Sequence, residues 1–246
     1  MRHPFYKILY ILLFFFLGSF QTAKGQVLIS LLFGEKLNSP NLEFGLEGGF
    51  NRSNLSGISE AKGYGHFHLG FYFDIRLKND LWLNTGVRIK SHAGAQNIDF
   101  YSLNDPELDA IFSRGTIKRK IGYFYVPIHL KYHFGAEKQF FFQAGGQIGL
   151  RNRAQDYFLS SFINSEDASF ELDIRDHIKG IDAGLSGGIG YKLRKGGVNL
   201  GVTFYQGLMN IMKTTIEGPY NYTSKNSNLY LFVRIPIGAG YKESNL

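Results

Sequence analysis

The stretch from His66 to Leu77 reads HFHLGFYFDIRL, and it changes chemical character at every residue. Its odd-numbered positions are all Phe, Leu or Ile, whereas its even-numbered positions include Asp74 and Arg76. Successive side chains of a β-strand point to opposite faces. A period of two therefore predicts a strand with one apolar face and one polar face.

The same alternation recurs along the rest of the chain. Further windows lie at 41–51, 81–91, 123–134, 140–151, 180–193, 198–208 and 228–238. Each has roughly 10 residues, the length that a tilted strand needs to cross a bilayer. Their apolar phase contains no charged residue, and its clear polar members are Thr85 and Gln206. This segregation predicts an all-β protein of about eight strands with one face in a strongly apolar medium.

The connections between these windows alternate in length. Those at 78–80, 135–139 and 194–197 are short, and those at 52–65, 92–122, 152–179 and 209–227 are long. Short periplasmic turns and long extracellular loops are typical of outer-membrane barrels. An even number of strands also places both termini on the side of the short turns, from which such a chain is inserted.

Alternation alone also fits a soluble lipocalin-like barrel, which places its apolar residues inside. Glycine separates the two arrangements, because far more glycines of the windows lie on the charged phase than on the apolar phase. A narrow lumen favours small residues. Aromatic residues near strand ends, such as Phe124, Tyr132 and Phe140, are typical of interfacial girdles. We therefore predict a closed, antiparallel, up-and-down transmembrane β-barrel with its charged face inside.

The N-terminus has the features of an export signal, because a basic start precedes an apolar run that ends in a small-x-small site. We predict a signal peptide at 1–25, a mature chain that starts at Gln26, and export to the bacterial outer membrane. One barrel domain is expected at 26–246. Its first segment, 26–39, does not alternate, and it is expected to be a plug, a membrane-surface segment or an extension of the first strand.

The composition excludes several classes of protein. Without cysteine, the chain is neither a disulfide-stapled domain nor a lipoprotein anchored through a cysteine. Its formal charge of +7 includes Arg2, Lys7 and Lys24 of the predicted signal peptide, and it is too modest and scattered to indicate nucleic acid binding. A content of 30 Gly and 23 Phe suits a tightly curved sheet better than helices.

Charged residues of the polar phase form the first candidate site. The predicted lumen-facing set is Glu43, Glu47, Asp74, Arg76, Arg88, Lys131, Asp182 and Arg234. An ion or proton path is one interpretation. The other interpretation is a structural network of salt bridges that closes the lumen, and charges of both signs in so narrow a lumen favour it. We therefore predict no solute-conducting pore.

Histidines and a Ser–His–Asp set are the candidates for chemistry. His66 and His68 share one face of a strand, where metal binding or acid–base work is conceivable, but no third ligand follows at a fixed spacing. Ser91, His92 and Asp182 fall at a similar height near the outer rim, a combination that arises easily by chance. We expect structural histidines, no catalytic motif, and no cofactor or metal.

The long loops carry clusters of charge. The basic cluster that closes the loop 92–122 consists of Arg114, Lys118, Arg119 and Lys120. These cations could contact lipopolysaccharide phosphates just above the membrane. The loop 152–179 is acidic instead. For both loops, the alternative interpretation is that the charged residues are simply solvated and bind no partner. Expected partners are outer-membrane lipid and lipopolysaccharide, with protein partners at the extracellular loops or the periplasmic end; the oligomeric state stays open.

Two prolines, Pro127 and Pro236, fall inside predicted strands. Proline has no N–H to donate to a neighbouring strand, so it is confined to strand ends, edges and bulges. We expect a local bulge at each.

One strand carries a resemblance to a known family. The stretch Gly122–Phe134, GYFYVPIHLKYHF, resembles the Y-x-x-I-P-L-x-x-K-Y strand of the PorT-like outer-membrane β-barrel proteins of Bacteroidetes. The glycine-rich window 41–51 and the signal ending at 24–26 are also similar. The chain differs from many such barrels because it ends without a terminal aromatic residue. The resemblance implies an integral outer-membrane protein; some members are tied to protein secretion and gliding, and the family has no catalytic motif to carry over.

The leading functional hypothesis is a non-enzymatic barrel with a closed lumen, a surface or scaffold protein that binds partner proteins or glycolipid. The alternatives are an outer-membrane enzyme that acts on lipid or peptide, and a soluble lipocalin-like barrel that binds a ligand. Fold class alone does not decide among them.

Overall fold

The computed structural model describes residues 39–160, 168–194, 197–213 and 220–237. The predicted signal peptide and nearly all of the segment 26–39 lie outside the described residues. No described helix has the length and hydropathy needed to cross a membrane.

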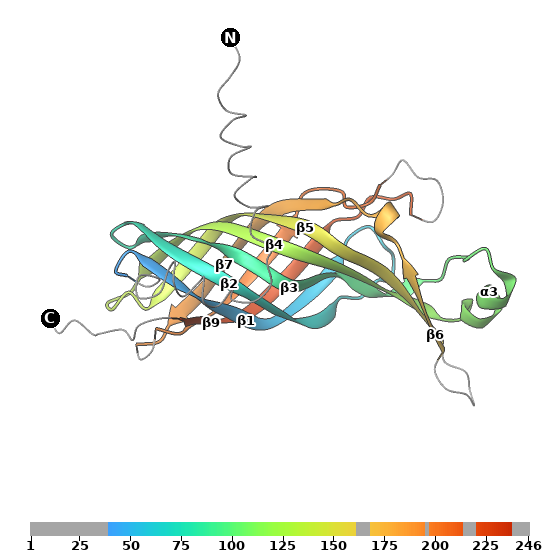
Figure 1. Cartoon of the computed structure of the whole chain (residues 1–246), viewed down its shortest axis with the longest axis horizontal. Coiled ribbons are helices and arrows are strands. Elements are labelled where there is room, and N and C mark those ends of the chain that lie inside the picture. The colour runs from blue at the N-terminus through green and yellow to red at the C-terminus, as the bar shows by residue number, and fades with distance from the viewer. Residues whose placement is uncertain (1–38, 161–167, 195–196, 214–219, 238–246) are drawn as a thin grey trace, which may run out of the picture. The chain divides into compact units, whose positions relative to one another are not determined.

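Antiparallel strands make up most of the described chain (Figure 1). Their bounds are β1 Leu42–Leu55, β2 Tyr64–Lys78, β3 Leu81–Asp99, β4 Thr116–Phe134, β5 Phe140–Ser160, β6 Ala168–Asp173, β7 Ile181–Lys192, β8 Asn199–Gly207 and β9 Asn226–Pro236. A short helix, α3 (Pro106–Phe112), follows β3, and a turn of 3-10 helix, η2 (Arg175–His177), follows β6. Asp105 caps α3, since its side chain accepts hydrogen bonds from the amides of Glu107 and Leu108.

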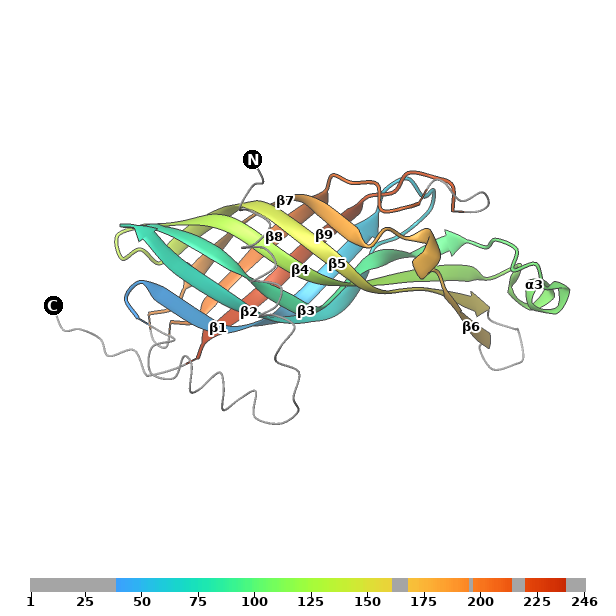
Figure 2. The same cartoon turned by 45° about the horizontal axis from the view of Figure 1, so that its top comes forward.

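The strands form a ring of hydrogen-bonded pairs. The sheet order is β4-β3-β2-β1-β9-β8-β7-β5-β6, and the additional pairing of β4 with β5 closes the ring. Every window predicted from the alternation corresponds to one strand of this ring. β6, which was not predicted, pairs with β5 alone among the described residues and lies outside the ring. Figures 1 and 2 show β6 and α3 beyond one end of the ring, the end of the long connections.

Three ring strands run further than the sequence predicted. β3 continues to Asp99, β4 begins at Thr116 and β5 continues to Ser160, so the predicted loops 92–122 and 152–179 are in part β-sheet. In β4 the inward phase continues, but the outward positions change from apolar residues to Lys118 and Lys120. In β3 and β5 an extra residue explains the error. Ile89 is unpaired where β2 meets β3, and Asn152 is unpaired where β4 meets β5.

An extra residue in one strand exchanges the two faces beyond it. In β5 the inward residues have odd numbers up to Gly149, and even numbers from Ala154 through Asp156 to Phe158. The alternation therefore breaks at each bulge although the strand continues.

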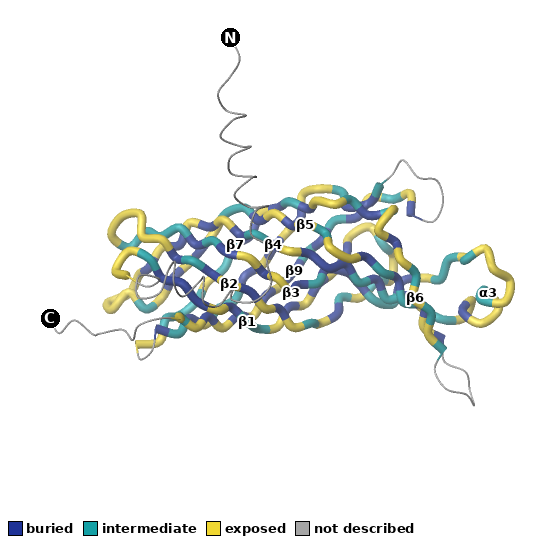
Figure 3. Tube along the Cα trace, in the orientation of Figure 1, coloured by how far each residue is buried: buried dark blue, intermediate teal, exposed yellow. Residues whose placement is uncertain are grey.

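The charged phase faces the interior of the ring and the apolar phase faces outward. In β2, Phe67 and Leu69 are 70% and 56% exposed, whereas Tyr72 and Asp74 are 1% and 3% exposed. Figure 3 shows this change between buried and exposed along the strands. Glycine makes room inside, as its partition between the faces predicted: a Cβ at Gly149 would lie 2.5 Å from Cε1 of the inward Tyr125.

Outward aromatic rings gather near the short turns, as the sequence indicated. The ring centroids of Tyr132 and Phe142 are 5.5 Å apart, those of Phe134 and Phe140 are 5.8 Å apart, and Phe140 contacts Tyr191 on β7 at 5.1 Å. Contacts of this kind continue across three neighbouring strands, the arrangement of an interfacial girdle.

Neither proline marks a bulge. Pro127 pairs with Gln147 of β5 without a change of register. On its other side, the pairing of β4 with β3 is interrupted between the pairs Thr85–Ile128 and Arg88–Tyr125. These two pairs have the same register, so the interruption is not a bulge. Within it, Thr85 Oγ1 donates to the Pro127 carbonyl at 2.9 Å. The missing N–H of Pro127 thus removes backbone hydrogen bonds to β3 but does not shift the register of the strands. Pro236 is the last residue of β9, where the ladder ends.

Candidate functional site

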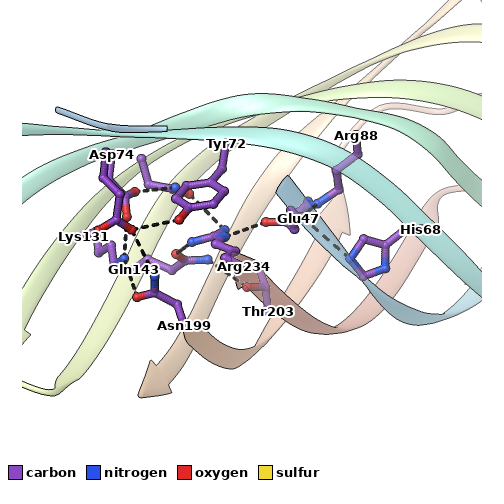
Figure 4. Close-up of polar contacts among 12 residues, drawn as sticks. Glu47, His68, Tyr72, Asp74, Arg88, Lys131, Gln143, Asn199, Thr203 and Arg234 are labelled. Atoms are coloured by element: carbon purple, nitrogen blue, oxygen red, sulfur yellow. Dashed lines mark hydrogen bonds and ion pairs between the residues drawn. The ribbon is translucent and has the colours of Figure 1, made fainter. Parts of the chain in front are cut away.

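The interior of the ring is crossed by buried ion pairs centred on Glu47 (Figure 4). Arg88 Nε donates to Glu47 Oε1 at 2.6 Å, and Arg234 Nε donates to Glu47 Oε2 at 2.6 Å. Each guanidinium group also binds a glutamine of β5. Arg88 Nη1 donates to Gln147 Oε1 at 2.7 Å, and Arg234 Nη1 donates to Gln143 Oε1 at 3.1 Å. Each of these side chains is at most 3% exposed, so one carboxylate compensates two buried cations.

A second group of ion pairs lies closer to the short turns. Lys131 Nζ is 2.6 Å from Asp74 Oδ2 and 4.1 Å from the centroid of the Phe141 ring. Lys192 Nζ is 2.5 Å from Glu43 Oε2. Asn199 joins the two pairs, because it contacts Lys131 Nζ at 3.4 Å and donates to Glu43 Oε1 at 3.2 Å.

These contacts run from one side of the ring to the other. Glu47 lies on β1, Arg88 on β3 and Gln147 on β5, and β1 and β5 are four positions apart in a ring of eight strands. Arg234 on β9 also reaches β5, through Gln143. Hydrogen-bonded side chains thus span the interior of the ring at this level. We call the set Glu43, Glu47, Asp74, Arg88, Lys131, Lys192 and Arg234 the lumen network.

Two residues of the predicted lumen set lie elsewhere. Arg76 is exposed, since it lies near the end of β2 where the ring opens, and its Nε donates to the Asn79 carbonyl at 2.7 Å. Its inclusion in the lumen set was wrong. Asp182 is fully buried but separate from the network, and its Oδ2 accepts from Asn226 Nδ2 at 2.8 Å and from the Tyr125 hydroxyl at 3.3 Å.

The histidines have partners that fit a structural role. His68 Nε2 is 3.7 Å from Glu47 Oε1, His129 Nε2 is 2.5 Å from Ser186 Oγ, and His133 Nδ1 is 2.9 Å from the Lys138 carbonyl. His66 Nε2 is 3.4 Å from Ser53 Oγ. Within the described ranges no three side chains of His, Cys, Asp or Glu come together in a way that could hold a metal ion.

The Ser–His–Asp candidates are not brought together. Ser91 Oγ contacts the Tyr230 hydroxyl at 3.3 Å, His92 stacks on His66 with ring centroids 5.2 Å apart, and Asp182 binds Asn226. In the described part of the chain no hydrogen bond links any two of the three. A proton relay needs the base within hydrogen-bond reach of the nucleophile, so this set has no catalytic geometry.

The long connections pack into one folded unit, which the sequence did not predict. We call it the cap; its described residues are 56–63, 92–122, 152–160, 168–180, 208–213 and 220–225. Ile117, Phe158 and Ile178 are at most 1% exposed in its apolar interior. Backbone hydrogen bonds join the connections pairwise: Lys62 with Gln96, Lys179 with Ile211, and Ser56 with Lys225.

A buried ion pair holds the centre of the cap. Arg119 Nε and Nη2 donate to Asp156 Oδ1 and Oδ2 at 2.8 and 2.6 Å, a two-bond pairing of guanidinium with carboxylate. Arg119 also donates to the Tyr222 hydroxyl, and the Tyr101 hydroxyl donates to Asp156 Oδ2 at 3.0 Å and bonds with the Tyr220 hydroxyl. Residues of three different connections thus meet around one ion pair.

Burial raises the pKa of the tyrosine hydroxyls in the cap. It raises the pKa of Tyr220 to about 12, and burial together with the nearby Asp156 carboxylate raises the pKa of Tyr101 well above its ordinary range. His177, which stacks on Tyr220 with ring centroids 3.9 Å apart, has its pKa lowered by burial. The tyrosine hydroxyls of the cap centre therefore remain hydrogen-bond donors at alkaline pH as well as at neutral pH.

The predicted basic surface cluster divides into two parts. Arg119 is 1% exposed and paired with Asp156, so its prediction as a surface residue was wrong: it shares the inward phase of β4 with Ile117 and Ile121. Arg114 is exposed after α3, and Lys118 and Lys120 lie on the outward phase of β4. Lys118 Nζ lies 4.8 Å from the centroid of the Tyr64 ring.

Solved structures of outer-membrane barrels are similar to this chain at low identity. Neisserial surface protein A is 13% identical, with 79% of this chain and 97% of that chain covered and a TM-score of 0.41. Ail of Yersinia pestis is 12% identical, with 81% and 100% covered and a TM-score of 0.40. OprG of Pseudomonas aeruginosa is 13% identical, with 81% and 97% covered and a TM-score of 0.38. No curated protein matches the chain.

The family comparison covers most of the chain. Residues 35–213 match the family described as the outer membrane protein beta-barrel domain, a span that begins before β1 and ends after β8. The ring of antiparallel strands and its apolar outward face agree with that description. The chain therefore belongs to the outer membrane protein beta-barrel domain family, whose place is the bacterial outer membrane.

Proposed function

We propose that the protein is a non-enzymatic surface protein of the outer membrane, with a closed lumen and with its cap outside the cell, where it binds partner protein or glycolipid. One observation carries the closed lumen: Glu47, Arg88 and Gln147 form a line of hydrogen bonds across the ring between β1, β3 and β5, and each side chain is at most 3% exposed. The cap lies over one end of the same ring.

The orientation follows from the two ends of the ring. Short turns, such as 79–80 and 135–139, are typical of the periplasmic side, and long connections are typical of the outer side. A folded cap on the outer side presents a rigid surface to partners. The sequence of the Pro127 strand supports the finer assignment to the PorT-like barrels. The periplasmic end of the ring is a second candidate surface for protein partners.

The alternatives are less well supported. The outward face exposes large apolar side chains along every ring strand, such as Leu69 at 56% and Leu185 at 61%, which a soluble ligand-binding barrel would bury. An enzyme acting on lipid or peptide would need a relay that Ser91, His92 and Asp182 do not form.

Planar-bilayer recordings test the closed lumen. The purified wild-type chain, inserted into a bilayer, is expected to give no stable unitary conductance, because ionised side chains fill the lumen cross-section. The variant E47A/R88A/R234A shortens three of these side chains and should conduct more than the wild type. A large, stable conductance of the wild type would contradict the proposal.

A further inference from the structure

Cations follow the last apolar residue on several strands at the cap end of the outward face. Arg52 follows Phe50 on the outward phase of β1, Lys90 follows Ile89 on β3, and Arg153 lies beyond Leu150 on β5. Lys118 and Lys120 occupy the corresponding outward positions of β4. We call Arg52, Lys90, Lys118, Lys120 and Arg153 the cationic girdle. It lies where an outward apolar band gives way to the cap.

Among the described residues, ion pairs occur at the short-turn end of the ring but not at the girdle. None of the five forms an ion pair with a described residue. Near the short turns, Lys138 pairs with Asp80 at 2.8 Å, Lys192 pairs with Glu43 and Arg194 pairs with Glu137. The two ends therefore differ in degree: in the described chain all five girdle cations lack an ion pair, whereas at the short turns Lys138, Lys192 and Arg194 are paired and Arg76 and Lys78 are not.

The girdle charges lie close together. Lys118, Arg153 and Lys90 each repel the ammonium of Lys120, which the Glu171 carboxylate attracts, and Lys120 and Lys118 repel a proton on His66. Like charges held this close are unfavourable unless an anion lies among them. The girdle is thus complementary to a ligand with several negative charges.

A hollow lies inside the girdle, between Arg52 and Lys118. It has a volume of about 390 Å³ and is lined by Phe50, Arg52, Gly63, Tyr64, Gly65, Gln96 and Lys118. The ring of Phe50 packs directly on Gly65, where a Cβ would lie 2.2 Å from Phe50 Cζ. A second hollow of about 220 Å³ lies on the other side of Arg52. The first hollow lies where the β2–β3 ladder is interrupted, between Leu69–Lys90 and Lys62–Gln96, and the second lies along β1 and β9.

We propose that the cationic girdle binds the phosphate groups of a phosphorylated glycolipid in the outer leaflet, one of them in the hollow between Arg52 and Lys118. Lys and Arg bind phosphate as charge-assisted donors, and cations at a membrane surface attract anionic lipid. The outward apolar residues beneath the girdle, such as Phe50 and Phe67, pack against the acyl chains of the same molecule. The inference rests on the proposed function, since it needs the cap end to face outward.

Counting the lipids that stay bound to the purified barrel tests this site. The full chain is reconstituted in phosphatidylcholine vesicles with a small fraction of either bisphosphorylated lipid A or its phosphate-free form. It is then extracted into mild detergent and analysed by native mass spectrometry. The wild type should retain phosphorylated lipid A, and R52Q/K118Q should retain about tenfold less. Both changes are at exposed or half-exposed positions, so the ring should persist.

A matched variant at the other end provides the control. K78Q/K138Q also removes two cations, and it should retain as much lipid A as the wild type. The lipid site is contradicted if the phosphate-free form binds equally, if R52Q/K118Q retains as much as the control, or if millimolar inorganic phosphate displaces the lipid. Each preparation is also run on a gel with and without boiling, because a folded barrel migrates differently when it is not boiled. If the chain is folded by this criterion but does not bind phosphorylated lipid A selectively, only the lipid site is overturned. A protein that does not insert into vesicles overturns the proposed function.

Discussion

Replacement of Glu47 by Gln is expected to lower the free energy of unfolding by about 3–5 kcal/mol. The reason is that Glu47 accepts from Arg88 and Arg234 at 2.6 Å each, and all three side chains are buried. The neutral amide keeps the shape of the side chain but leaves two guanidinium groups without a negative partner. Urea unfolding in vesicles, followed through the fluorescence of the single tryptophan, Trp82, measures the change.

Two comparisons show whether the effect comes from buried charge. The variant D80N removes the carboxylate of the exposed pair with Lys138, and it should change stability by only about 0–1 kcal/mol. In E47L/R88M/R234L all three charges are removed together, and stability should return toward that of the wild type because no unpaired charge remains. Equal stability of E47Q and D80N would contradict the role of the lumen network.

Replacement of Leu130 by Arg is expected to cost about 2–4 kcal/mol in a bilayer. Leu130 is 54% exposed on the outward face, near the middle of the apolar run of β4 between Phe124 and Phe134. In lipid the new charge loses its hydration, whereas on a surface in water it would be tolerated. The same urea titration in vesicles measures the difference.

The matched control places the same charge in the cap. Leu159 on β5 is 41% exposed beyond the bulge at Asn152, so L159R should change stability by no more than about 0–1 kcal/mol. If L130R is as stable as L159R, the outward face does not lie in lipid.

The alternation of side chains was enough to predict the ring and its inside. It located each of the ring strands, and the distribution of glycine placed Glu47, Asp74 and Arg234 inside. It did not reveal the ends of the strands in the cap, because Ile89 in β3 and Asn152 in β5 each exchange the two faces, and because the outward positions of β4 become Lys118 and Lys120. A search that permits one extra residue would have found Ala154, Asp156 and Phe158 in phase.

The errors at single residues have a related cause. Arg119 belongs to a basic run, which suggested a solvated surface, but its position on β4 points it inward. Its partner Asp156 lies on a different strand, and Tyr222 on a different connection, so only the assembled cap brings them together. Arg76 has the phase of a lumen residue, yet it lies at the end of its strand, where the ring opens to solvent.

Cysteine labelling in intact cells tests the central claim most directly, because the chain has no cysteine of its own. Single cysteines are introduced at Asn104 in the cap, at Ala136 in a short turn and at Leu130 on the outward face, and cells are treated with a membrane-impermeant maleimide. We predict that the cysteine at 104 is labelled in intact cells, that at 136 only after the outer membrane is permeabilised, and that at 130 only after denaturation. Labelling at 136 in intact cells, or at 130 in the native membrane, would contradict a barrel that spans the outer membrane with its cap outside.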